Sequence, residues 1–395
     1  MSTTLPMPSA DAQAHSAHMR ELIQEQIIAA GGSIPFWKYM ELVLYAPGLG
    51  YYSAGAHKFG AGGDFTTAPE RSPLFSACVA DALAPVLRQL GDEAVFVELG
   101  GGSGAFAEAC LLTLQQRGIL PARYALLEPS ADLRQRQRER LQAQLPAEVF
   151  ARVEWLDGPI QTPWRGVLFA NEVIDALPTP RFVIQDDEVW EEHVGLDGEG
   201  RFVVLEKPAD AMLQAAVRNV QQRLSEPLPE GYRSEVLAQL PYWVQAVMGG
   251  LQAGALLLID YGYARGEYYL PERHTGTLRA FRQHHVTNDV FAWPGLQDIT
   301  ASVDFTALAE AGVGAGFEFS GYCSQASFLL GNRLQENLQE AEAQAADEAA
   351  RHGLRQQAKT LTLPSEMGER FQAIGFHRGV DFDPAFLLGD LSHRL

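Results

Sequence analysis

A cluster of glycines follows a short apolar stretch in the sequence FVELGGGSGAF, at residues 96–106. Gly100, Gly102 and Gly104 form a GxGxG pattern, which puts bare backbone where a strand turns into a helix. A ligand can lie close against such a turn, but the same pattern also occurs as a purely structural connection. The glycines alone leave both interpretations open.

Three acidic residues lie at the ends of successive apolar stretches. Glu98 directly precedes the glycines, Glu128 ends RYALLE and Asp157 ends RVEWLD. If these stretches are parallel strands, their carboxyl ends share one edge of a sheet, which is where such folds bind ligands. Each acid alone is equally explained as a helix cap or a solvated loop residue.

The order of these acids indicates which ligand would fit. Glu98 would repel a pyrophosphate but suits a ligand that carries ammonium and sulfonium charges. Glu128 can accept hydrogen bonds from both hydroxyls of a ribose, and Asp157 can accept one from an adenine amino group. The three acids together predict a site for S-adenosyl-L-methionine.

A fourth apolar stretch ends in NEVIDALP, residues 171–178. Asn171, Glu172 and Asp175 would then lie at the same sheet edge as the expected methyl group, and we predict them to be catalytic. Carboxylates at this place would bind a guanidinium group and align one of its nitrogens with the methyl carbon. No metal is required for such a transfer. The alternative is that Asn171 and Asp175 cap the following helix.

The net charge of the 395-residue chain is −19, from 49 acidic and 30 basic residues. A chain with this charge is repelled by nucleic acids and by anionic membrane surfaces, whereas basic proteins are attracted to it. We expect a protein substrate, no nucleic acid and no membrane insertion.

The three cysteines show neither metal-ligand spacing nor a disulfide pattern. The N-terminal residues resemble neither a signal peptide nor a transit peptide. These features predict a cytoplasmic protein without a metal site.

The chain from residue 94 to 172 alternates between strand-like and helix-like stretches. We expect strands at 94–99, 123–129, 152–157 and 166–172, with helices after the first two. The alternation predicts an α/β fold with a Rossmann-like parallel sheet. Residues 182–206 instead alternate between apolar and polar residues and turn at Asp197-Gly198, as an inserted antiparallel ribbon would.

These patterns divide the chain into five expected segments. They are a disordered tail at 1–17, an N-terminal cap and lid region at 18–75, a cofactor-binding Rossmann-like half at 76–180, an inserted antiparallel ribbon with helices at 181–250, and the second half of the core sheet with C-terminal helices at 251–395.

Eight segments, in order from about residue 20 to 378, together resemble the MidA-like family. They are GGDFTTAPERSPLF, ELGGGSGAF, LLEPSADLRQRQRERL, FANEVIDALP, LLLIDYGY, GTLRAFRQH, DITASVDFTALA and LPSEMGERF. The mitochondrial members of this family are protein arginine methyltransferases that help to assemble respiratory complex I. The resemblance implies a class I methyltransferase core with a seven-stranded sheet, an N-terminal cap and inserted α+β elements.

The resemblance also implies which residues hold S-adenosyl-L-methionine. They are Glu98, Gly100, Gly102, Gly104 and Glu128 in the sheet, and Gly63, Asp64 and Thr66 in the segment GDFTTAPE, which would belong to the cofactor or substrate pocket. One residue departs from the family pattern, since Gly101 stands where proline is usual. Glycine there fits the turn but leaves it looser.

We therefore expect a methyltransferase that uses S-adenosyl-L-methionine and modifies arginine side chains of a protein, with a respiratory complex subunit as one possible substrate. One alternative is an assembly chaperone or binding protein that retains the cofactor pocket without catalysis. Another is an NAD-dependent oxidoreductase, against which Glu98 argues. The oligomeric state stays open, with a dimer as one possibility.

Overall fold

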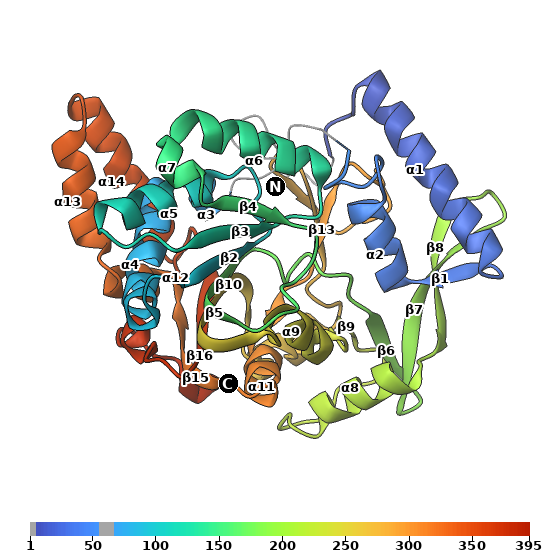
Figure 1. Ribbon diagram of the computed structural model, residues 1–395. Helices are drawn as coiled ribbons and strands as arrows, with labels where there is room; N and C mark the ends of the chain where they lie inside the picture. Colours follow the sequence, from blue (N-terminus) through green and yellow to red (C-terminus); the bar gives the residue numbers. More distant parts are fainter. Residues whose placement is uncertain (1–4, 55–66) are drawn as a thin grey trace. The chain divides into compact units, whose positions relative to one another are not determined.

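The computed structural model of the protein describes residues 5–54 and 67–395. Its residues form two compact units, and the elements of both are labelled in Figure 1. Unit 1 combines residues 5–54 with Ile174–Leu240 and Tyr263–Asp304, and unit 2 combines residues 67–173 with Pro241–Gly262 and Phe305–Leu395. Both units are thus built from separate stretches of the chain.

Unit 2 is built on a mixed sheet whose strands follow one another in a continuous path. Their order is β15 (Glu318–Ser324), β16 (Phe371–Arg378), β10 (Leu251–Tyr263), β5 (Trp164–Asn171), β2 (Val95–Leu99), β3 (Arg123–Leu127) and β4 (Val153–Leu156). The five strands from β10 to β4 are parallel to their neighbours, whereas β16 is antiparallel to both β10 and β15. The predicted α/β fold is confirmed.

Helices surround this sheet. They are α3 (Ala68–Arg71), α4 (Pro73–Leu90), α5 (Ala105–Gln116), α6 (Ala131–Gln144), α7 (Ala147–Phe150), α9 (Leu240–Met248), α11 (Phe305–Gly314), α12 (Gln325–Gly331), α13 (Leu334–Gln344) and α14 (Glu348–Thr362), with 3₁₀ turns η2 (Asp383–Phe386) and η3 (Ser392–Arg394). Local sequence sets several of their ends. The Ser72 hydroxyl accepts from the Leu74 N–H and Pro73 opens α4, and the Ser130 hydroxyl caps α6 by accepting from the Leu133 N–H.

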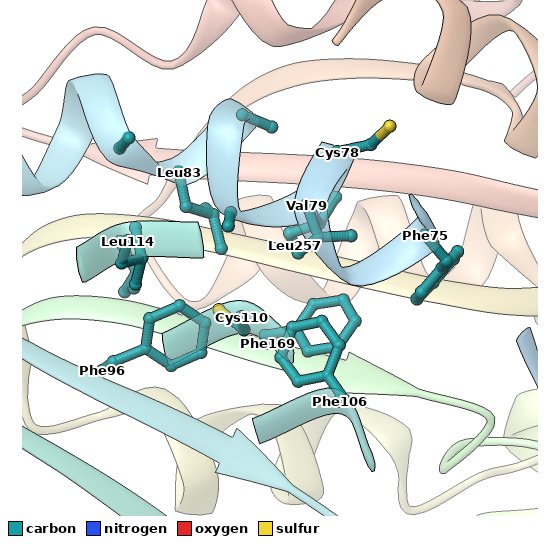
Figure 2. Close-up of a cluster of buried hydrophobic side chains, with 14 of the residues drawn as sticks. Phe75, Cys78, Val79, Leu83, Phe96, Phe106, Cys110, Leu114, Phe169 and Leu257 are labelled. Carbon is teal, nitrogen blue, oxygen red and sulfur yellow. The ribbon is translucent and has the colours of Figure 1, made fainter. Parts of the chain in front are cut away.

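Aromatic side chains fill the core between α4, α5 and one face of the sheet. Figure 2 shows Phe75, Cys78, Val79 and Leu83 of α4 together with Phe96, Phe106, Cys110, Leu114, Phe169 and Leu257. The rings of Phe106 and Phe169 stack with centroids 4.2 Å apart. Each buried ring of this size stabilises a fold by about 1.5–3 kcal/mol. This cluster therefore holds α5 firmly against the sheet.

The register of the parallel strands aligns their carboxyl ends. Leu99, the last residue of β2, pairs with Leu127 at the end of β3 and with Ala170 near the end of β5. The residues that follow these strands therefore emerge at one edge of the sheet, as the candidate site requires.

Unit 1 contains two antiparallel sheets. The larger has the order β1-β7-β6-β9 with β8 paired to β7, and the smaller has the order β12-β11-β13. The elements of this unit are α1 (Ala10–Ala29), β1 (Ser33–Pro35), α2 (Phe36–Tyr45), β6 (Arg181–Gln185), β7 (Glu188–Leu196), β8 (Phe202–Pro208), α8 (Ala211–Gln221), β9 (Arg233–Glu235), α10 (Arg265–Tyr268), η1 (Pro271–Arg273), β11 (Arg279–Arg282), β12 (His285–Thr287), β13 (Asp298–Thr300) and β14 (Val303–Asp304). The predicted ribbon with a turn at Asp197 corresponds to β7 and β8.

The first helix begins earlier than expected. Residues 10–17, assigned above to a disordered tail, form the first turns of α1, where the Ser9 hydroxyl accepts from the Ala12 N–H. Ser16 is buried, and its hydroxyl donates to the Pro294 carbonyl at 2.9 Å. These contacts within unit 1 hold a stretch that has few apolar residues of its own.

Candidate functional site

The glycine turn after β2 has the backbone that only glycine adopts easily. The φ angles of Gly100, Gly102 and Gly104 are +65°, +51° and +84°, in the left-handed region that strains residues with a side chain. A Cβ on Gly100 would also lie only 2.8 Å from Cγ2 of Val173. Conformation and close packing therefore both require glycine here.

Glu128 lies directly beyond β3 and is buried. Its carboxylate accepts from the Ser130 N–H at 3.0 Å and from Nε2 of Gln137 at 3.4 Å. Burial raises the pKa of Glu128 to about 7, against the opposing effect of these donors and of the Gly102 backbone. Since a carboxylate offers about four acceptor positions, these donors leave Glu128 with the capacity to accept a further hydrogen bond.

Glu98, near the end of β2, is even more secluded, with 3 % of its surface exposed. The Tyr124 hydroxyl donates to its Oε2 at 2.6 Å. Burial raises the pKa of Glu98 to about 8, and the negative charge of Glu128 adds to the rise while Tyr124 opposes it. In their ionised forms, these two neighbouring buried acids favour a cationic ligand and disfavour a phosphate, and a bound cation would in turn favour their ionisation.

This burial predicts an effect on stability. Because the folded-state pKa of Glu98 lies above its ordinary value, folding favours the protonated form, and that stabilisation is lost as the pH rises through about 8. Glu98→Gln should therefore match the ligand-free wild type near pH 5 and be more stable at pH 9, by on the order of 2–4 kcal/mol. Denaturant unfolding across this pH range measures the difference.

The matched control for this experiment is Glu93→Gln, an exposed acid just before β2. It should show no such trend. A stability difference between Glu98→Gln and wild type that does not change with pH would contradict the prediction.

Asp157 lies just beyond β4, and its side chain is almost fully exposed. Nη1 of Arg134 donates to its Oδ1 at 2.8 Å, while Nε of the same arginine donates to the Glu128 carbonyl at 2.5 Å. Arg134 thus ties the ends of β3 and β4 together. The adenine-binding role of Asp157 stays a prediction, with its carboxylate engaged by Arg134 in this structure.

Asn171 and Glu172 meet at the end of β5. Nδ2 of Asn171 donates to Oε1 of Glu172 at 2.9 Å, and the Glu172 N–H donates to the Ile259 carbonyl at 2.9 Å. Glu172 has a φ angle of +54°, a conformation that costs about 1 kcal/mol or more and clusters at functional sites. The Asn171 Oδ1 atom is buried and has no hydrogen-bond partner among the described residues.

The structure does not gather all predicted site residues in one unit. Asp175 belongs to unit 1, where it is buried and its carbonyl accepts from the Ala301 N–H at 2.9 Å. Gly63, Asp64 and Thr66 lie outside the described residues. The residues that unit 2 brings to one sheet edge are therefore the glycine turn, Glu98, Glu128, Asp157, Asn171 and Glu172.

The last residue of the GDFTTAPE segment makes a contact that its sequence did not predict. Glu70, in α3, accepts a hydrogen bond from the Ser103 hydroxyl within the glycine turn. Nη1 of Arg140 donates to the same hydroxyl at 3.1 Å, and its Nε pairs with Glu108 at 2.6 Å. The described end of this segment is thus anchored to the glycine turn.

Neither a metal centre nor a membrane span is visible in the described parts of the chain. Residues 5–54 and 67–395 contain no group of three or more histidine, cysteine or acidic side chains placed to hold a metal. None of the helices in these residues is both long and apolar enough to cross a membrane.

Two buried acids beside bare glycine backbone fit a ligand that carries hydroxyls and positive charge and lacks phosphate. Residues 78–323 match the model of a family described as S-adenosyl-L-methionine-dependent methyltransferases, and the chain belongs to this family. The predicted enzyme class and the family's cofactor are confirmed, and the NAD-dependent alternative is set aside.

Relatives and solved structures agree with this assignment. A Danio rerio protein named protein arginine methyltransferase NDUFAF7, mitochondrial, is 30% identical over 87% of this chain and 83% of its own length. The Drosophila melanogaster homolog of that name is 28% identical over 94% and 88%. A Burkholderia thailandensis crystal structure bound to S-adenosyl-homocysteine is 41% identical, with a TM-score of 0.91 and coverage of 99% of this chain and 100% of that one. The suspected MidA-like family is thereby confirmed.

Proposed function

We propose that this methyltransferase modifies arginine side chains of a protein substrate. The single observation that supports this most strongly is the oriented carboxylate of Glu172 at the end of β5, held by the Asn171 amide on a strained backbone. The names of the Danio rerio and Drosophila melanogaster relatives point to the same acceptor.

The cofactor residues of this proposal come from unit 2. Glu128 would accept from the ribose hydroxyls, and Glu98 would lie close enough to favour the positive charges of the ligand. The turn of Gly100, Gly102 and Gly104 would offer backbone without side chains. When bound, S-adenosyl-L-methionine supplies a methyl group activated by the positive charge of its sulfur. The buried carboxylates and the bare turn fit this ligand because it carries hydroxyls and positive charge and lacks phosphate.

Glu172 performs the acceptor chemistry in this proposal. A guanidinium stays protonated in proteins and spreads its charge over three nitrogens. One oxygen of the Glu172 carboxylate would accept from a neighbouring nitrogen and draw positive charge to it, while the other would accept from the nitrogen that receives the methyl group and fix its orientation. The nitrogen that gains a methyl group must lose one proton, and the Glu172 carboxylate accepts it. Asn171 keeps the carboxylate in place through its Nδ2 bond.

The experiment that tests the proposal is methyl transfer to proteins of the source cells. The purified enzyme is incubated with lysate and isotope-labelled S-adenosyl-L-methionine, and modified peptides are identified by mass spectrometry. We expect labelled methyl groups on arginine nitrogens. Label found only on lysine, on carboxylates or on small molecules would overturn the proposal.

The remaining expectations stay predictions. A respiratory complex subunit is the substrate that the family resemblance suggests, and the same mass spectra would identify it. The two relatives are named as mitochondrial, whereas the composition of this chain led us to expect the cytoplasm. Cell fractionation tests that location, and sedimentation of the purified protein tests whether it forms a dimer.

A further inference from the structure

Gln137 is a fully buried polar residue in the middle of α6. Its Nε2 donates to the Gly102 carbonyl at 2.9 Å and to Oε2 of Glu128 at 3.4 Å. Its Oε1 accepts from Nε1 of Trp155, on β4, at 2.9 Å. One amide therefore joins the glycine turn, the acid beyond β3 and the strand β4.

The partners of this amide allow only one orientation. The indole nitrogen of Trp155 can only donate, so it must face the amide oxygen. The Gly102 carbonyl and the ionised Glu128 carboxylate can only accept, so they must face the amide nitrogen. A flipped amide would oppose donor to donor and acceptor to acceptor. The orientation follows from chemistry, and Trp155 enforces it.

The glycine turn packs directly against this side chain. A Cβ on Gly101 would lie 3.1 Å from Nε2 of Gln137 and 2.7 Å from Cδ2 of Leu126. A Cβ on Gly104 would lie 3.4 Å from the Cα of Gln137. A side chain at position 101 would therefore have to displace the ends of Leu126 and Gln137, whereas glycine leaves the amide in place against the Gly102 carbonyl.

We propose that Gln137 is a positioning residue for cofactor binding. Its amide holds the glycine turn and the Glu128 carboxylate in one fixed arrangement, and the hydrogen bond from Trp155 fixes the orientation of that amide. The inference rests on the cofactor role proposed for Glu128. A buried glutamine with a structural role alone would change protein stability and leave ligand affinity intact, which separates the two possibilities.

The charged groups near Glu128 determine how ligand affinity should depend on pH. Arg134 on α6 favours its ionised form, and Glu98 on β2 faces it as a second acid. Ser130 and Gln137 supply neutral donors. Loss of the Gln137 donor should raise the pKa of Glu128. As the pH is lowered, ligand affinity should therefore begin to fall at a higher pH than it does in the wild type.

The test is calorimetric titration of the full-length protein with S-adenosyl-homocysteine at pH 6 to 9. Gln137→Met keeps the length of the side chain and removes the amide. We expect its Kd to rise about 10- to 100-fold, since hydrogen bonds to a charged group and to the turn are both lost. Trp155→Phe should raise Kd about 3- to 10-fold because the amide is no longer held in one orientation. The control Gln142→Met, at an exposed position of the same helix, should bind like the wild type.

A double variant isolates the coupling. In protein that already carries Glu128→Gln, the further change Gln137→Met should raise Kd much less than it does alone. Wild-type affinity in Gln137→Met overturns the inference, whatever happens to stability. If Gln137→Met does not fold, Trp155→Phe decides alone, and wild-type affinity in that variant overturns it.

The outcomes also separate this inference from the proposed cofactor role. Unchanged affinity in Glu128→Gln means that the role of Glu128 is wrong, and the present inference falls with it. Weakened binding in Glu128→Gln together with wild-type binding in Gln137→Met overturns only the role of Gln137.

Discussion

Replacing Glu172 by glutamine is expected to slow methyl transfer by about a hundredfold or more, with little change in affinity for S-adenosyl-homocysteine. The variant keeps the shape of the side chain but loses the negative charge that would bind the guanidinium. It also loses the base that would accept the proton, and general base catalysis alone typically contributes about 10²- to 10⁴-fold. Single-turnover transfer to an arginine peptide identified by the lysate experiment measures the rate.

The design distinguishes chemistry from binding. The Kd for S-adenosyl-homocysteine, measured by calorimetry, should stay within about twofold of the wild type, because the proposed cofactor contacts lie at the ends of β2 and β3. Glu318→Gln, at an exposed acid that begins β15, serves as the control and should leave both quantities unchanged. A Glu172→Gln enzyme that transfers methyl groups at the wild-type rate would show that Glu172 is not the acceptor group.

Glu128→Gln should weaken S-adenosyl-homocysteine binding by about a hundredfold at pH 8. Hydrogen bonds to an ionised group contribute about 1.5–3 kcal/mol each, and the proposed contact to the ribose contains two. Because the pKa of ligand-free Glu128 is raised to about 7, wild-type affinity should fall as the pH drops below this value. The Glu128→Gln variant should lack the part of this dependence that comes from Glu128, so the ratio of the two Kd values should be larger at pH 8 than at pH 6.

Protein stability provides the check that this loss is not unfolding. Burial raises the pKa of Glu128 above its ordinary value, so its contribution to stability is present at low pH and is lost as the pH rises through about 7. Glu128→Gln should therefore be at least as stable as the wild type at pH 8. Glu139→Gln, an exposed acid on α6, is the matched control. Equal affinity of Glu128→Gln and wild type at pH 8 would contradict the assignment.

Local signals in the sequence predicted much of unit 2. Apolar stretches bounded by glycine and by caps such as Ser130 identify β2, β3, β5 and the helices that follow β2 and β3. Parallel pairing then brings the ends of these strands to one edge of the sheet. The alignment of Glu128 and Glu172 is thus a consequence of topology, which is why the sequence was sufficient to predict it.

Long-range contacts account for what the sequence did not reveal. Gln137 lies between Leu133 and Leu141 on the buried side of α6. A polar residue in an apolar stripe is a signal that could have identified Gln137. Its contact with Trp155 could not be predicted, because Trp155 lies on the separate element β4. The grouping of residues 5–54 with Ile174–Leu240 in unit 1 likewise depends on long-range contacts, which local sequence does not show. Similarly, the start of α1 depends on contacts such as that of Ser16 with Pro294.

The position of β16 has a consequence for how the protein is made. This strand lies between β10 and β15, although it comes after both in the chain. During translation, one edge of β10 lacks its partner strand β16 until residues 371–378 have left the ribosome. Because β15 pairs with β16, it cannot join the described sheet before then. Nascent chains arrested before this point should therefore be the species that chaperones bind and that aggregate when chaperones are scarce.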